Sequence, residues 1–138
     1  MPKLLTIAVD FDGTLVENQY PKIGKPILFA FETLKKLQND GHQIILWTYR
    51  SGAKLDEAVA FCRSKGISFY AINKSYPEEE YDNYMSRKIL ADIFIDDRNI
   101  NGLPPWGEIY HQLAAGEGAV SRSLKKESGL RKIFKKLK

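Results

Sequence analysis

Cysteine and histidine are nearly absent from the chain, which contains one cysteine, Cys62, and two histidines. A single cysteine cannot form a disulfide within the chain, and it cannot build a cysteine-based zinc site. His42 and His111 have no partner at the spacing of a metal site or a catalytic triad. These scarcities exclude a disulfide scaffold and leave oxygen-bearing side chains as the candidates for chemistry.

Long hydrophobic runs are also missing. No stretch approaches the roughly 18 apolar residues of a membrane span. The opening MPKLLTIAVDFDG has only a short apolar run, reaches an acid at Asp10 and is not followed by a small-residue cleavage site, so it does not resemble a signal peptide. With 138 residues, 43% of them hydrophobic and 28% charged, the composition is that of one soluble globular domain. We therefore expect a cytoplasmic protein.

Positive charge is scarce in most of the chain and concentrated at its end. Residues 116–138 contain eight Lys or Arg and two Glu, a net charge of +6, whereas residues 1–115 have a net charge of −2. We therefore divide the chain into a body, residues 1–115, and a basic tail, residues 116–138. The tail starts with a flexible joint, GEGAVSRS, and continues with a predicted short amphipathic helix. It could contact nucleic acid or an acidic surface, but we favour a solvated tail.

The body alternates between buried strands and helices. Apolar, β-rich segments predict strands at residues 4–11, 42–48, 67–73 and 91–97. Apolar residues at helical spacing predict helices at residues 26–41, 55–66 and 104–114, with Pro26 opening the first and Gly41 ending it. Residues 78–90 are ambiguous between helix and turn. This alternation predicts a Rossmann-like α/β fold, in which helices cover both faces of a mostly parallel sheet in three layers.

Polar side chains follow three of the four predicted strands. They are Asp10 and Asp12 after the first strand, Thr48 after the second, and Asp96 and Asp97 after the fourth, which Lys88 precedes. Because ligands of such sheets bind beyond the carboxyl ends of the strands, these side chains should face one crevice. Asp10 and Asp12 leave their strand on the same face and repel each other, so a cation between them is expected. Hard oxygen ligands of this kind suit Mg²⁺, which also takes a substrate phosphate.

These residue types suit phosphoryl transfer. One carboxylate can attack phosphorus and form an aspartyl-phosphate. A second carboxylate two residues further on can protonate the leaving oxygen and then deprotonate the attacking water. Thr48 and Lys88 can bind the transferring oxygens, where negative charge must be neutralised.

Four features of the chain resemble, in this order, the four motifs of the haloacid dehalogenase (HAD) superfamily. They are DFDGT at residues 10–14, the threonine of IILWT, Lys88 and IFIDD. The resemblance covers roughly residues 4–99. It implies a Rossmann-like fold, Mg²⁺ as cofactor, and hydrolysis of phosphate monoesters through an aspartyl nucleophile. It makes Asp10 the nucleophile and Asp12 the general acid and base. Thr48 would hold the phosphoryl oxygens, and Lys88 would pair with the nucleophile and the phosphate.

The resemblance also implies the metal ligands and an open site. Asp97 would be the main metal ligand, supported by Asp96, although the pattern leaves the order of these two open. Asp10 and the main-chain carbonyl of Asp12 would complete the ligand set. Many relatives insert a cap domain after the first or second motif, but neither gap in this sequence is long enough for one. We therefore expect a capless phosphatase-like enzyme, and the organic part of its phosphorylated substrate stays open.

The sequence leaves several alternatives open. Lys74, at the end of the third predicted strand, competes with Lys88 for its role. Arg50 could grip a substrate anion bidentately, although a surface position is more frequent for arginine. Trp47 could border the site. As a whole, the protein could instead be a non-catalytic anion-binding module that retains the HAD fold, or a module associated with nucleic acid through the basic tail.

Overall fold

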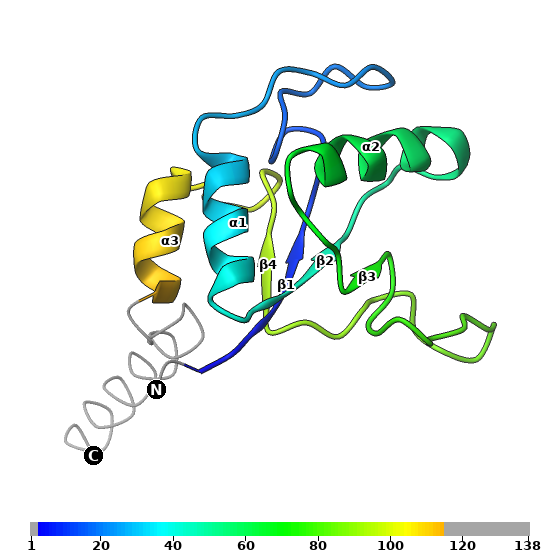
Figure 1. Ribbon diagram of the computed structural model, residues 1–138. Coiled ribbons are helices and arrows are strands. Elements are labelled where there is room, and N and C mark those ends of the chain that lie inside the picture. The colour runs from blue at the N-terminus through cyan, green and yellow to red at the C-terminus, as the bar shows by residue number, and fades with distance from the viewer. Residues whose placement is uncertain (1–2, 115–138) are drawn as a thin grey trace, which may run out of the picture.

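The computed structural model describes residues 3–114. Its strands are β1 (Thr6–Val9), β2 (Gln43–Leu46), β3 (Ala71–Ile72) and β4 (Ile93–Ile95). Its helices are α1 (Ala30–Asn39), α2 (Gly52–Ser64) and α3 (Trp106–Ala114). All paired strands are parallel, and their order in the sheet is β3-β2-β1-β4 (Figure 1). The prediction of an α/β fold with a parallel sheet is confirmed.

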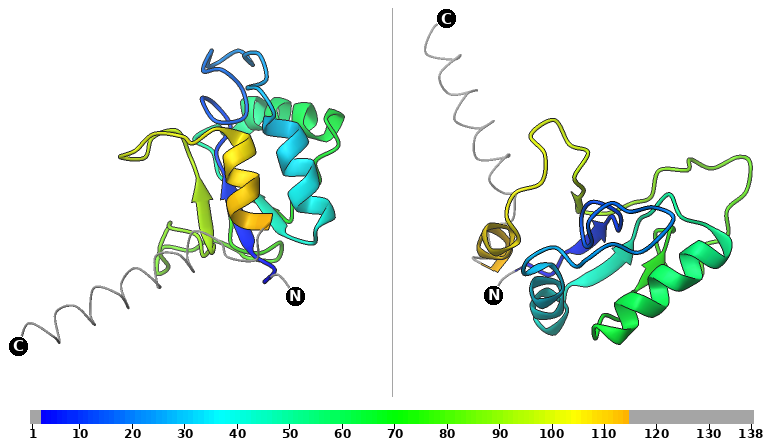
Figure 2. Two further views of the ribbon diagram at one scale, coloured as in Figure 1. Left: turned by 90° about the vertical axis from the view of Figure 1, so that its left-hand side faces the viewer. Right: turned by 90° about the horizontal axis from the view of Figure 1, so that it is seen from above.

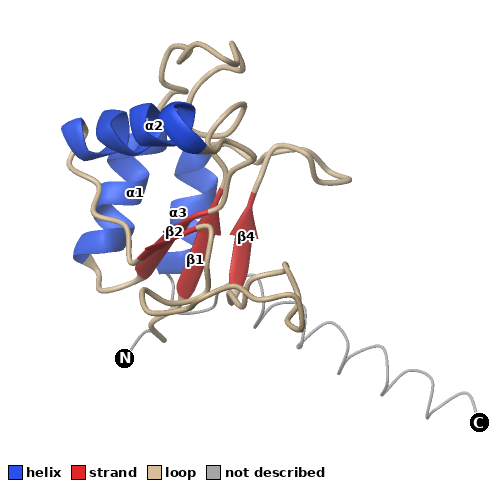
Figure 3. Ribbon diagram, turned by 90° about the vertical axis from the view of Figure 1, so that its right-hand side faces the viewer, coloured by secondary structure: helices blue, strands red, loops and turns tan. Residues whose placement is uncertain are grey.

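The three helices cover one face of the sheet. Alternate residues of β1, Ile7 and Val9, point to that face. They share one buried cluster with residues of every helix, among them Leu34, Cys62 and Trp106. Figures 2 and 3 show the three helices on the same side of the strands. This cluster is the main core of the body.

The opposite face carries a smaller cluster, formed by Ala8 and Ile45 with Ala71 and Ile89. Ile89 belongs to residues 73–92, which connect β3 to β4 through turns and bends without a helix. Right-handed connections place α1 and α2 on the same face because both run in the same direction across the sheet, whereas the return from β3 to β4 must cross the other face. The predicted third layer of helices is therefore not seen in residues 3–114. The ambiguity of residues 78–90 is resolved in favour of turns.

Helix α1 begins four residues later than predicted, at Ala30 rather than Pro26. Phe29, which precedes it, has a φ of 65°, in the left-handed region, so the right-handed helix cannot extend back through it. Pro26 instead forms an antiparallel bridge with Val16. The predicted end is close to the observed one, because α1 stops at Asn39 and Gly41 has a φ of 102°.

Within residues 3–114, no helix is both long enough and apolar enough to cross a membrane. This agrees with the lack of long hydrophobic runs in the sequence. The flexible joint and the amphipathic helix predicted for the basic tail lie outside the described residues.

Candidate active site

Three carboxylates meet at the carboxyl ends of β1 and β4. Val9 pairs with Ile95 in the parallel ladder, so Asp10 and Asp96 directly follow the paired positions. One carboxylate oxygen from each of Asp10, Asp96 and Asp97 lies within 4.8 Å of the others. We call these three residues the acidic triad. The structure thus brings together three of the predicted site residues, in an arrangement that could hold a metal ion.

The pKa of Asp10 is raised to about 7, first by burial and then by the negative charge of Asp96. The backbone N–H of Phe11 lowers this pKa, but the effect is smaller than that of burial. A nearby cation would favour the charged form of Asp10 and offset the repulsion within the acidic triad. The donor set consists of hard carboxylate oxygens only, which fits Mg²⁺ and does not fit a soft metal.

Without metal, Asp10 should make the fold less stable as the pH rises. Its pKa is higher in the folded protein than in the unfolded chain, so the stability that its proton provides at low pH is lost as the pH rises through about 7. We expect the melting temperature of metal-free protein to fall between about pH 4 and about pH 7 and Asp10 to add no further change above that range, and we expect Mg²⁺ to restore the melting temperature chiefly at about pH 7 and above. Thermal melts with and without a chelator measure this. The Asp10→Asn variant should lack this component, and an unchanged pH dependence in that variant would refute it.

Thr14 ties two members of the acidic triad together. Its buried hydroxyl lies 3.1 Å from Asp97 Oδ1 and 3.3 Å from Asp10 Oδ2, either of which can accept its proton. The backbone N–H of Asp97 donates to the same hydroxyl oxygen at 3.0 Å. Trp106 Nε1 donates to the Thr14 carbonyl at 3.0 Å, which anchors the turn to α3. The turn after β1 therefore fixes the distance between carboxylates of two strands.

Gly13 makes this turn possible. Its φ of 87° is one that residues with a side chain rarely adopt. A Cβ atom at this position would overlap the Asp97 carboxylate. The glycine of DFDGT is therefore required both by the backbone conformation and by the close approach of the acidic triad.

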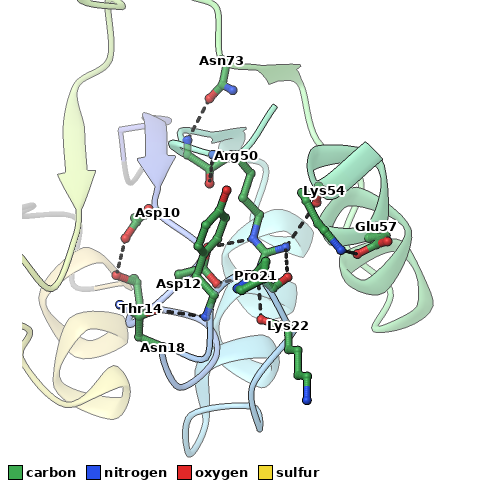
Figure 4. A network of polar contacts seen from close by, with 12 residues as sticks. Asp10, Asp12, Thr14, Asn18, Pro21, Lys22, Arg50, Lys54, Glu57 and Asn73 are labelled. Carbon is green, nitrogen blue, oxygen red and sulfur yellow. Dashed lines mark hydrogen bonds and ion pairs between the residues drawn. The ribbon is translucent and has the colours of Figure 1, made fainter. Parts of the chain in front are cut away.

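Arg50 is buried, with 1% of its surface exposed, and forms a bidentate ion pair with Asp12. Nε donates to Asp12 Oδ2 at 2.7 Å and Nη2 to Oδ1 at 2.8 Å. The remaining guanidinium N–H groups donate to the carbonyls of Pro21, Lys22 and Lys54 (Figure 4). Arg50 thereby joins the strand ends, the loop between β1 and α1, and the first turn of α2.

This arrangement corrects both sequence-based expectations for Arg50. The residue is not at the surface, and all five of its N–H groups already donate to protein acceptors, so none is left for a substrate anion. Asp12, by contrast, lines the cavity described below and is 15% exposed. A carboxylate has about four lone-pair sites and Arg50 takes two, so Asp12 can still accept from a ligand.

Thr48 lies where the sequence places it, beyond β2 and in the wall of the cavity. Its backbone N–H donates to Asn73 Oδ1 at 2.8 Å, and its hydroxyl oxygen accepts from the backbone N–H of Arg50 at 3.1 Å. The hydroxyl proton is not used in either contact, so it is available to a ligand oxygen. Asn73, which has a φ of 55°, thus positions Thr48 from the end of β3.

Lys88 is not brought to the cavity. It is exposed, and its ammonium lies 5.9 Å from the centre of the Phe94 ring. Phe94 packs against the smaller cluster on the second face of the sheet. Its rival Lys74 does not line the cavity either, whereas Arg87 and Arg98 do. The structure does not place Lys88 at the cavity, because residues 73–92 follow an irregular course that the sequence pattern does not define.

The cavity has a volume of about 880 Å³ and opens over the carboxyl ends of the strands. Its walls carry acids, polar side chains, aromatic rings and arginines, namely Asp10, Asp12, Asp96, Asn18, Thr48, Tyr20, Trp47, Tyr49, Arg87 and Arg98. The acids and the hydroxyl of Thr48 therefore share one solvent-accessible space with a group of aromatic side chains.

Comparison with known proteins gives one informative match. No family model matches the chain, and no curated protein matches it. A solved structure of a conserved protein from Bacteroides thetaiotaomicron is 56% identical, with a TM-score of 0.77 over 82% of this chain and 92% of that chain. The chain belongs to the family of that conserved protein. The match supports the fold and carries no activity with it.

Two residues of the site do not stand out in the sequence. Thr14 is part of DFDGT, but the sequence alone assigns it no role, and the structure shows that its hydroxyl contacts two carboxylates. Asn73, which positions Thr48, gave no signal beyond its place at the end of a predicted strand. The position of Thr14 within the motif could have identified it from the sequence. The role of Asn73 can be recognised only in the tertiary structure.

Proposed function

We propose that the protein is a Mg²⁺-dependent phosphohydrolase of HAD type, which hydrolyses phosphate monoesters through an aspartyl-phosphate on Asp10. One observation carries the proposal. Asp10, Asp96 and Asp97 converge at the carboxyl ends of neighbouring parallel strands, and the pKa of Asp10 is raised to about 7. An acid with a perturbed pKa that lines a cavity, as Asp10 does, is typical of sites that bind metal and act on substrate.

Mg²⁺ would be held by Asp10 and by Asp96 and Asp97, together with the main-chain carbonyl of Asp12. When bound, it would keep Asp10 ionised and neutralise charge on the phosphoryl oxygens. The ligand count leaves room for waters and one substrate oxygen, as Mg²⁺ prefers. Thr14 would keep Asp10 and Asp97 at a fixed separation while the metal and substrate exchange.

In the first half-reaction, a carboxylate oxygen of Asp10 attacks phosphorus, forming the P–O bond of the aspartyl-phosphate as the P–O bond to the leaving group breaks. Asp12, which must be protonated at this step, gives its proton to the leaving oxygen and becomes the carboxylate that pairs with Arg50. In the second half-reaction, Asp12 takes a proton from water, which attacks phosphorus, and Asp10 is released with inorganic phosphate. Arg50 orients the Asp12 carboxylate for both transfers, and the Thr48 hydroxyl donates to a phosphoryl oxygen.

The site would work without a cap domain. Between Thr14 and Thr48 the chain forms a loop, α1 and β2, and between Thr48 and Lys88 it forms α2, β3 and part of the irregular connection. Neither interval contains a separate folded unit. The cavity is therefore open to substrates larger than a small phosphorylated metabolite.

A phosphate-release screen tests the proposal. Purified protein is incubated with Mg²⁺ and a panel of phosphate monoesters that includes a generic aryl phosphate. We expect release that requires Mg²⁺, is abolished by a chelator, and is inhibited by Ca²⁺, because the larger ion takes more ligands and disturbs in-line attack. Metal-independent release, or no release from any ester, would contradict the proposal.

A second candidate function is a non-catalytic anion-binding module that retains the HAD fold. The position of Lys88 favours it, because a HAD hydrolase would need that cation near the phosphate, and here it lies over Phe94. The two candidates differ in the screen, since a binding module would retain phosphate esters without releasing phosphate. An association with nucleic acid rests on the basic tail, which lies outside the described residues.

A further inference from the structure

Three aromatic side chains line the same cavity as the acids. Trp47 and Tyr49 follow β2, and Tyr20 comes from the loop between β1 and α1. Tyr49 is 92% exposed and Tyr20 is 50% exposed. Their ring centres lie 6.4 Å apart, in an edge-to-face arrangement. The cavity is thus lined both by acids and by aromatic rings.

Contacts with Arg50 fix the position of Tyr20. Its ring lies 5.2 Å from the Arg50 guanidinium, which also lies over Phe11 at 5.1 Å. Arg50 in turn holds the carbonyls of Pro21 and Lys22, the two residues that follow Tyr20. The loop that carries this ring is therefore held over the strand ends before any ligand enters. A preformed aromatic surface binds with a smaller ordering cost than a mobile one.

A single exposed aromatic side chain is ordinary in a folded protein. Three that line one cavity offer ring faces on which a planar group can stack. The volume of about 880 Å³ lies toward the upper end of the range for small-molecule sites. A phosphorylated sugar alone would leave these aromatic walls exposed to water.

Two arginines complete the cavity. Arg87 and Arg98 are exposed, and neither forms an ion pair with an acid in residues 3–114. Nε of Arg87 donates only to the Tyr81 hydroxyl, at 3.2 Å. Because the phosphate to be cleaved must lie at the acidic triad, these guanidinium groups are available for a second anionic group on the substrate, which they can bind bidentately.

We propose that the substrate is a nucleotide that carries a second phosphate. Its base stacks on Tyr49 and the neighbouring aromatic rings, its scissile phosphate lies at Asp10, and its second phosphate meets Arg87 and Arg98. This inference rests on the proposed phosphohydrolase function for the position of the scissile phosphate. The base-binding surface itself rests on the aromatic walls alone.

Matched substrates test the inference. Adenosine 5′-monophosphate and ribose 5-phosphate present the same phosphate ester and differ in the base. We expect kcat/KM to be at least about tenfold higher for the nucleotide, the order of magnitude of one base–aromatic stack. Adenosine 3′,5′-bisphosphate should be better still, and Arg98→Gln should remove that extra preference. Equal kcat/KM for the nucleotide and ribose 5-phosphate would overturn the inference and leave the phosphohydrolase proposal intact.

Single substitutions test whether Tyr49 is the ring on which the base stacks. Tyr49→Ala should reduce the preference for the nucleotide about tenfold, and Tyr49→Phe should retain it because the ring is kept. Tyr84→Ala is the matched control, since Tyr84 is 99% exposed and does not line the cavity. An equal preference in Tyr49→Ala and Tyr84→Ala would overturn the assignment of the base to Tyr49.

If the protein releases no phosphate at all, measurements of ligand binding test the nucleotide site instead. Calorimetry on the full chain then compares the dissociation constants of adenosine 5′-monophosphate and ribose 5-phosphate. A constant about tenfold lower for the nucleotide, lost in Tyr49→Ala, would support the nucleotide site although the phosphohydrolase proposal had failed. Equal constants would overturn the nucleotide site as well.

Discussion

Replacing Asp10 by asparagine should lower the rate of phosphate release at least about a hundredfold, the lower range for a group that takes part in bond making. The amide has no charged oxygen to attack phosphorus, and it also removes one negative charge from the acidic triad. The variant should still fold, because asparagine has nearly the same shape. At about pH 8 without metal it should melt no lower than the wild type, since it lacks a carboxylate that burial and Asp96 destabilise.

Asp56→Asn is the matched control for this variant. Asp56 is an exposed residue of α2 outside the cavity, so its replacement should change neither turnover nor melting. If Asp10→Asn kept more than about a hundredth of the wild-type rate, the covalent mechanism would be wrong.

Replacing Arg50 by methionine should produce the largest loss of stability among single substitutions at the site, about 3 kcal/mol, or about 10 °C in melting temperature. The change leaves the Asp12 carboxylate without its partner and three backbone carbonyls without their donor. It also releases the loop that carries Tyr20. Turnover should fall with stability, because Asp12 would no longer be oriented. Chemical denaturation and steady-state kinetics measure the two effects.

One further variant separates geometry from charge at this position, and a second, at Arg63, is the matched control. Arg50→Lys retains the positive charge but cannot reproduce the planar set of five donors, so it should also be destabilised. Arg63→Met removes an exposed arginine at the end of α2 and should change stability by less than about 0.5 kcal/mol. If Arg50→Met were no less stable than Arg63→Met, Arg50 would not organise the site.

The convergence of the acids could be predicted from the sequence. Asp10 and the Asp96–Asp97 pair each follow an apolar segment short enough to be a strand, and the carboxyl ends of parallel strands meet at one edge of the sheet. This prediction needs only strand assignment and strand direction. It does not depend on which helices cover which face, so the wrong expectation of three layers did not affect it.

The partners of these acids could not be predicted in the same way. Arg50 and Asp12 are separated by 38 positions, and their ion pair depends on how the loop after β1 folds over the end of β2. The position of the Lys88 side chain could not be predicted for a related reason, because residues 73–92 have no regular structure from which a side-chain direction follows. The late start of α1 likewise depends on the left-handed conformation of Phe29, for which the sequence carries no signal.

The covalent intermediate is the most direct observable of the proposed chemistry. The Asp12→Asn variant, in which deprotonation of the attacking water is impaired, is mixed with Mg²⁺ and an ester that the wild type hydrolyses, quenched in acid, digested and examined by mass spectrometry. A phosphoryl group on Asp10, absent when Mg²⁺ is omitted and absent from an Asp10→Asn/Asp12→Asn double variant, is the predicted result. Phosphate release by the wild type with no phosphorylated peptide in Asp12→Asn, or a phosphoryl group on another residue, would contradict it.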